Sequence, residues 1–126
     1  MSVTHYIDKK AKIVHVIAKG KISIEDLINQ ERKVIQDTDF EKGINAFIDF
    51  SEAQPSETVD LDRIKMGVDF FESIQEIRGK CKWAIFAPYE FAYSLSKFYS
   101  RFSKERLPIK TKVFKNEAEA KRWLKS

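Results

Sequence analysis

The 126-residue sequence contains one cysteine, four glycines and three prolines, and these scarcities exclude several classes of protein. A lone cysteine, Cys81, cannot form an internal disulfide, and no cluster of cysteine and histidine has the spacing of a zinc site. No loop has the glycine pattern that cradles a phosphate group in nucleotide-binding proteins. We therefore expect no metal and no cofactor.

Long hydrophobic runs are also lacking. The longest, WAIFA at residues 83–87, is too short to span a bilayer, and FIDF at residues 47–50 is interrupted by Asp49. The first ten residues lack the apolar stretch of a secretory signal. Hydrophobic residues nevertheless make up 43% of the chain, which is enough to bury a core. We expect a cytoplasmic protein that forms a single domain over residues 1–126.

Charge is distributed unevenly along the chain. Residues 1–77 carry 10 basic and 15 acidic side chains, a net charge of −5, whereas residues 78–126 carry 13 basic and 4 acidic ones, a net charge of +9. Such a basic region attracts nucleic acid, anionic lipid or an acidic protein in some proteins. Because no nucleic-acid-binding motif accompanies the charge, we favour a solvated surface and do not expect a nucleic-acid partner.

Hydrophobic periodicity predicts strands (β) and helices (α) in the order ββαβαβαβα. The expected elements are a hairpin over residues 5–20 that turns at Lys9-Lys10, a helix over 23–37 with a capping box at Ser23 and Asp26, a strand over 44–50, a loop over 51–58, a helix over 60–79, a strand over 81–87, a helix over 88–102, an edge strand over 109–114 and a helix over 116–124 capped by Asn116. Alternating strands and helices predict an α/β protein. We expect a mixed, mostly parallel five-stranded sheet packed with four helices.

The helix expected over residues 88–102 is rich in aromatic residues. At about 100° per residue, one arc of this helix predicts a stripe that faces the core. The stripe consists of Phe91, Leu95, Phe98, Tyr99 and Phe102. Lys97, Arg101 and Lys104 lie on the opposite side with Ser94 and Ser100, and so does Tyr93. We therefore expect Tyr93 to be exposed; an ordinary surface residue is the interpretation that we favour, and contact with a partner is the alternative.

The helix expected over residues 60–79 has an unusually wide apolar face. Its apolar residues cover an arc of about 220°, roughly twice the width of an ordinary surface helix. The surplus lies around Met66, Phe70 and Ile77. A neighbouring helix, another subunit or a bound apolar ligand must cover it. A neighbouring helix is the interpretation that we favour; for the alternative, a partner or ligand surface, we predict the residues Met66, Phe70, Ile77 and Tyr93.

Polar residues lie at the end of the strand over 44–50 and in the loop after it, where ligands of parallel sheets bind. They are Asp49, Ser51, Glu52, Ser56 and Thr58. The dipole of the following helix would favour a phosphoryl group on Ser56 or Thr58. Helix capping and solvation of the loop is the alternative that we favour. Asp49 and Glu52, together with Tyr89, also allow an enzymatic site, but no catalytic motif supports it.

The other chemically notable residues are His5, His15 and Cys81. A hairpin that turns at Lys9-Lys10 places the two histidines on opposite faces of the sheet, so we expect no metal site there. Lysines on both sides of Cys81 could lower its pKa, but a small buried hydrophobic residue is the interpretation that we favour.

Several strings resemble the SpoIIAA-like family, small bacterial proteins related to STAS domains and sometimes described as STAS/SEC14-like. YIDKKAKIVHVIAKGKIS resembles the family's opening hairpin, FIDFSEA its third strand, WAIFAPYEFAYSLSKFY its strand, Ala-Pro and helix segment, and KVFKNEAEAKRWL its ending V-F-x-x-x-x-E-A-x-x-W-L. Ser94 and Lys97 stand where Gly and Arg are common. SETVDLD, in which Glu57-Thr58 is nearest by position, replaces the phosphorylated Asp-Ser-[Ser/Thr]-Gly of anti-sigma-factor antagonists.

The resemblance implies a SpoIIAA/STAS-like fold and a non-enzymatic module. Such a module binds a protein partner or itself, here as a homodimer. The kinship with SEC14-like proteins allows an alternative, a carrier or sensor of a small apolar or lipid-like ligand. That alternative requires a pocket between the sheet and the helices.

Overall fold

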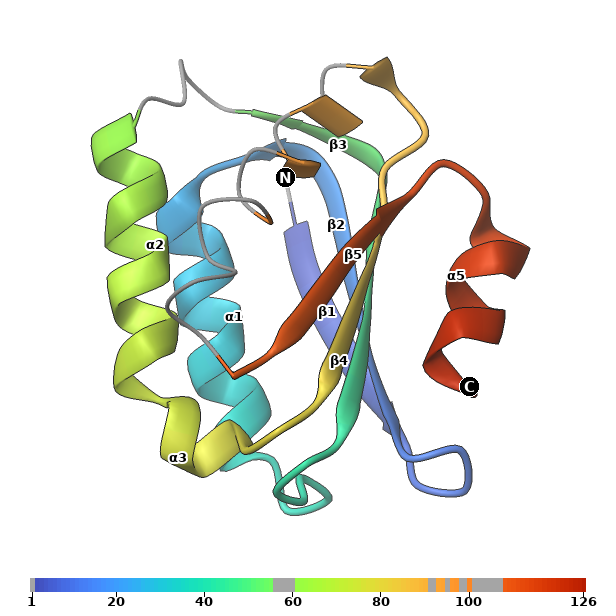
Figure 1. The fold of residues 1–126 in the computed structure, drawn as a ribbon. Coiled ribbons are helices and arrows are strands. Elements are labelled where there is room, and N and C mark those ends of the chain that lie inside the picture. Colours follow the sequence, from blue (N-terminus) through green and yellow to red (C-terminus); the bar gives the residue numbers. More distant parts are fainter. Residues whose placement is uncertain (1, 56–60, 91–92, 95, 98–99, 101–107) are drawn as a thin grey trace.

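The computed structural model describes residues 2–55, 61–90, 93–94, 96–97, 100 and 108–126. Five strands form one sheet in the order β1-β2-β3-β4-β5 (Figure 1). They are β1 (Ser2–Asp8), β2 (Ile13–Ile22), β3 (Asn45–Pro55), β4 (Lys82–Phe86) and β5 (Lys110–Phe114). β1 pairs antiparallel with β2, and every other pair of neighbours is parallel. The predicted α/β class and the mixed, mostly parallel sheet are confirmed.

Helices cover both faces of the sheet. They are α1 (Ile24–Gln36), α2 (Leu61–Ser73), α3 (Gln75–Arg78) and α5 (Glu117–Leu124). α1 and α2 lie on one face, and α5 lies on the other (Figure 1). The predicted caps are confirmed: Ser23 and Asp26 form a capping box at α1, and the Asn116 side chain accepts a hydrogen bond from the Glu119 N–H at α5.

The strands alternate between two hydrophobic clusters, as the period of two in a strand requires. In β3, Ala46 packs beneath α1 and α2, whereas the next residue, Phe47, packs against α5. Trp83 of β4 meets Phe71 of α2 edge to face, with ring centroids 4.9 Å apart. The central strands are therefore apolar on both sides, which explains why their sequences show little alternation.

The β1–β2 hairpin differs in detail from the prediction. Its turn covers residues 9–12 rather than Lys9-Lys10 alone, and Tyr6 pairs with His15 while His5 pairs with Val16. The register differs by two residues, and an even shift leaves every side chain on its expected face. The two histidines therefore lie on opposite faces, as predicted.

The prediction of a loop over residues 51–58 is wrong for its first half. β3 continues to Pro55, because residues 52–55 pair with residues 19–22 of β2 after a shift in register. The helix predicted over residues 60–79 is also interrupted. α2 ends at Ser73, Ile74 has φ −106° and ψ 9°, and the short α3 follows and ends before Gly79.

The aromatic helix lies partly outside the described residues, including its predicted stripe of Phe91, Leu95, Phe98, Tyr99 and Phe102. The described positions correct its expected orientation. Tyr93 is half-buried against the cluster of Ile85, Ala87 and Val113 rather than exposed. Ser100, expected on the polar side, is buried, and its hydroxyl donates a hydrogen bond to the Thr111 carbonyl oxygen at 3.0 Å. Residues 93 and 100 therefore face inward.

Candidate functional site

A cavity of about 150 Å³ lies between the sheet and helices α1 and α2. Its walls are almost entirely apolar. They include Val14, Val16, Leu27, Ala46, Ile48 and Ile64. Three of the lining residues are small: Ala46 and Ala53 of β3, and Gly67 of α2. Small residues on these two elements leave room for the space.

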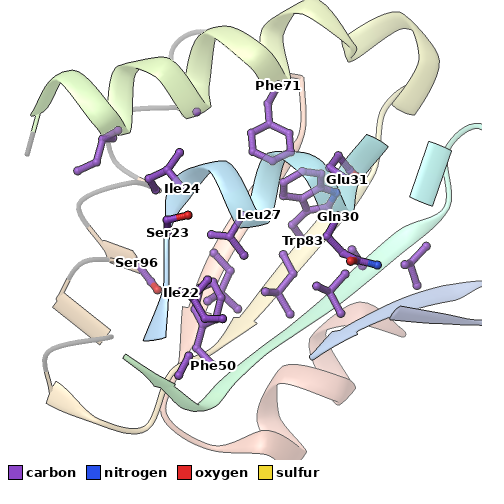
Figure 2. Close-up of a pocket in the computed structure, with 18 of the residues that line it drawn as sticks. Ile22, Ser23, Ile24, Leu27, Gln30, Glu31, Phe50, Phe71, Trp83 and Ser96 are labelled. Atoms are coloured by element: carbon purple, nitrogen blue, oxygen red, sulfur yellow. The ribbon is translucent and has the colours of Figure 1, made fainter. Parts of the chain in front are cut away.

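Polar groups gather at the two ends of the cavity. Figure 2 shows Gln30 and Glu31 of α1 beside Trp83 at one end, and Ser23 and Ser96 at the opposite end. Arg78 of α3 also lines the cavity. A pocket with apolar walls and a few convergent polar groups is the common form of a small-molecule site.

Arg78 and Glu31 form a buried ion pair. The Arg78 Nε lies 3.4 Å from the Glu31 Oε1, and the two side chains are only 1% and 8% exposed. The approach does not have hydrogen-bond geometry. Within the part of the chain that the structure describes, the Arg78 Nε and Nη1 atoms have no hydrogen-bond acceptor. The guanidinium is therefore balanced in charge but not saturated in hydrogen bonds.

Burial controls the protonation of Glu31. Removal from water raises the pKa of the Glu31 carboxyl from 4.5 to about 7, and the nearby Arg78 charge only partly opposes this rise. A carboxyl group with a pKa near neutrality inside a cavity marks a candidate functional site.

A second polar chain connects the cavity wall to the surface. The Gln30 Nε2 donates to the His5 Nδ1 at 2.6 Å, and the His5 Nε2 donates to the Asp37 Oδ2 at 2.8 Å. The Asp39 N–H and the His5 bond lower the pKa of Asp37. This chain fixes the Gln30 amide, and it gives His5 a structural role.

The residues predicted as a partner or ligand surface separate into two groups. Met66 is 38% exposed and Ile77 is 47% exposed, so both remain on the surface. Phe70 is half-buried against the core, and the Arg32 guanidinium lies 5.0 Å from its ring centroid. The neighbouring helix α1 therefore covers Phe70. Tyr93 is half-buried, as described above, and the Lys115 ammonium lies 4.5 Å from its ring centroid.

The described residues of the predicted loop site, Asp49, Ser51 and Glu52, do not line the cavity. The Asp49 carboxylate accepts a hydrogen bond from the Ser51 N–H at 2.8 Å, and Glu52 pairs with Lys19 at 3.6 Å. Ser56 and Thr58 lie outside the described residues. Tyr89, the third member of the enzymatic alternative, is 64% exposed. Asp49 and Glu52 are thus engaged in local contacts of their own.

Cys81 is buried, and burial raises the pKa of its thiol. Its flanking lysines do not activate it, so the interpretation as a buried hydrophobic residue holds. The described residues contain no group of three or more histidine, cysteine, aspartate or glutamate side chains placed to hold a metal ion. No helix among the described residues is long and apolar enough to cross a membrane.

Sequence reasoning missed the polar end of the cavity, although α1 carries a signal for it. Leu27, Ile28 and Val34 lie on the buried face of this helix, and Glu31 lies three or four positions from each of them. A carboxylate in the middle of an apolar helical face is expected to be buried and paired. The partner, Arg78, lies 47 positions away and has no local signal.

No protein-family model matches the chain, and no curated protein matches it significantly. Among solved structures, the chain is similar to an uncharacterized protein of the DUF3478 family with a SpoIIAA-like fold from Shewanella loihica PV-4. The sequences are 18% identical, the TM-score is 0.62, and the match covers 98% of this chain and 92% of the other. At this identity the likeness concerns the fold. The chain has a SpoIIAA-like fold, as its sequence strings indicated.

Proposed function

We propose that this protein is a non-enzymatic binding module whose cavity holds one small apolar molecule. The cavity between the sheet and helices α1 and α2 carries the proposal. An engineered apolar cavity of about 150 Å³ in another protein stays dry and binds benzene. The cavity of the present protein has the same size and similarly apolar walls.

The free energy of an empty cavity supports a resident ligand. Loss of packing costs about 24 cal/mol for each Å³ of cavity. For an enclosed space of about 150 Å³ the cost is about 3–4 kcal/mol, and it is smaller here because the pocket is partly open to the surface. A molecule that fills the space restores contacts of this kind, and a gain of up to this size corresponds to a dissociation constant of a few mM or weaker.

Toluene tests the proposal directly, with the Trp83 indole N–H as the reporter on the cavity wall. We expect a saturable change in the NMR frequency of this group during a toluene titration. The chain has two tryptophans, and Trp123→Phe identifies the Trp83 signal. Gly67→Leu places a larger side chain on the cavity wall and should abolish the response, whereas the matched control Met66→Leu changes an exposed neighbour and should preserve it.

Native mass spectrometry of freshly purified protein complements the titration. Extra mass that denaturation removes would support a resident ligand and begin to identify it. If the Trp83 signal does not respond to toluene, or responds equally in Gly67→Leu, the cavity is not a binding site and the proposal fails.

Self-association through the outer surface of α2 and α3 is the second candidate. Met66 and Ile77 favour it, because both are large apolar side chains that remain exposed. The same native spectra report a homodimer or a bound protein partner. Ile77→Asp should then yield a monomer, whereas the matched Ile77→Ala should weaken the assembly less. A wild-type protein that stays monomeric at high concentration rules out the homodimer.

A further inference from the structure

The wall of the cavity contains a buried cation, Arg78, which is paired with Glu31 and whose hydrogen-bond donors are not all used. Arg78 is 1% exposed and lines the cavity. A guanidinium carries five N–H donors, and among the described residues nothing accepts from the Arg78 Nε or Nη1. Buried donors are normally paired, so these two atoms call for an acceptor that the described part of the chain does not supply.

Aromatic packing holds the guanidinium in place. The Arg78 Cζ lies 5.0 Å from the Trp83 ring centroid and 5.5 Å from that of Phe40. The backbone is fixed as well, because the Gly43 N–H donates to the Arg78 carbonyl oxygen at 2.7 Å. A ligand therefore meets donors that are already ordered, which reduces the entropic cost of binding. Planar guanidinium groups are well suited to carboxylates.

Charge balance adds a second requirement. With Glu31 ionised, the Glu31–Arg78 pair is neutral, and a bound carboxylate would leave one uncompensated negative charge in the interior. A proton on Glu31 removes that charge. The raised pKa of Glu31, about 7, makes this protonation accessible near neutral pH. The titratable groups that face Glu31 are Arg78 of α3 and the Cys81 thiol before β4, and its neighbour Gln30 is a neutral amide.

Building on the proposed function, we propose that the cavity binds a small monocarboxylate with an apolar tail. The Arg78 guanidinium donates hydrogen bonds to the carboxylate, the tail lies among the apolar residues, and Glu31 takes up one proton as the anion binds. The net reaction consumes one anion and one proton, so the charge of the interior does not change.

The test compares benzoate with benzamide, a neutral molecule of nearly the same shape, and uses the Trp83 indole N–H signal as before. At pH 6 we expect the wild-type protein to bind benzoate about tenfold more tightly than benzamide, because hydrogen bonds to charged groups are the stronger ones. Above pH 7 the affinity for benzoate should fall by about tenfold per pH unit, since binding then requires a proton. The affinity for benzamide should not follow pH in this way.

Two variants separate the roles of the pair. Glu31→Gln removes the titrating group, so the affinity for benzoate should become independent of pH between 6 and 9. Arg78→Met should reduce the ratio of benzoate to benzamide affinity to about one. Since the ratio is measured within each variant, and the pH series on the wild-type protein requires no substitution, altered folding of Arg78→Met does not decide the result.

The outcomes distinguish this inference from the proposed function on which it rests. If toluene binds but benzoate does not bind more tightly than benzamide at any pH, the carboxylate inference is wrong and the apolar cavity remains a binding site. If Arg78→Met keeps the preference for benzoate, another cation binds the anion and the inference is wrong. If no probe, toluene included, changes the Trp83 signal, both proposals fail.

Discussion

Glu31→Gln should change how the stability of the protein depends on pH. The pKa of the Glu31 carboxyl rises from 4.5 to about 7 on folding because burial penalises its charged form. The folded state therefore binds this proton more tightly than the unfolded chain does. The contribution of Glu31 to stability is fully present below pH 4.5 and is lost as pH rises to about 7. The pKa difference of about 2.5 corresponds to about 3 kcal/mol.

Urea unfolding measured between pH 4 and pH 8 tests this value. We compare the free energies of unfolding of the wild-type protein and of Glu31→Gln at each pH. The wild-type value minus the variant value should fall by about 3 kcal/mol from pH 4 to pH 8, which corresponds to a relative shift of about 1–2 M in the urea midpoint. Glu41→Gln is the control, because Glu41 is an exposed carboxylate in the loop after α1. Its difference from the wild-type protein should vary by less than about 0.5 kcal/mol. A Glu31→Gln difference that is flat or that rises with pH would refute the reasoning.

Three further predictions concern other parts of the molecule. Gly67→Leu should raise the free energy of unfolding by about 1–3 kcal/mol in urea titrations, because it removes a helical glycine and fills the cavity, whereas Met66→Leu should change it by less than about 0.5 kcal/mol. Ser23→Ala should lower the same free energy by about 1 kcal/mol through loss of the capping box of α1, and no change would show that this cap is unimportant. The Cys81 thiol should react with a disulfide reagent about 100-fold more slowly in the native protein than in urea, since burial raises its pKa and blocks access; equal rates would contradict its burial.

Local sequence patterns predicted most of the fold because each element carries its own periodicity. The apolar face of α1 and the capping box that starts it are both visible within 14 residues, 23–36. The strands that became β3 and β4 were recognisable as short apolar runs, and Asn116 marked the start of α5. Even the misplaced hairpin turn left the faces of β1 and β2 correct, because the register error was even.

The errors arose where tertiary contacts override local preference. Residues 51–55 contain Ser, Glu, Gln and Pro, which are typical of a loop, yet they extend β3 because the second half of β2 offers a pairing edge. The interruption of the helix at Ile74 has no proline or glycine to announce it. Tyr93 was placed on the polar side by helical angle alone, whereas the structure packs it against Val113 and Ile85.

The cavity was beyond local sequence reasoning for a different reason. An empty volume is a property of side chains that do not meet, and Ala46, Ala53 and Gly67 are brought together only by the fold. Of the buried ion pair on the cavity wall, the sequence indicated only one member. Glu31 interrupts an apolar helical face, which indicates a buried charge. Its partner, Arg78 of α3, is brought to it only by the fold. Sequence therefore indicates that α1 buries a polar group and does not indicate what that group faces.

The Arg78–Glu31 pair is a poor means of stabilising a domain of this size. Removing two charges from water costs several kcal/mol for each ion, and the attraction offsets that cost only when the geometry is good and the remaining donors are satisfied. Here the Arg78 Nε and the Glu31 Oε1 are 3.4 Å apart, and the Arg78 Nη1 has no acceptor among the described residues. The pair nevertheless lies on the wall of an apolar cavity that has room for an acceptor. A ligand carboxylate would supply the missing hydrogen-bond acceptors. The unsatisfied donors of Arg78 destabilise the empty protein, so their pairing with a carboxylate would favour binding of an acidic ligand over a neutral one.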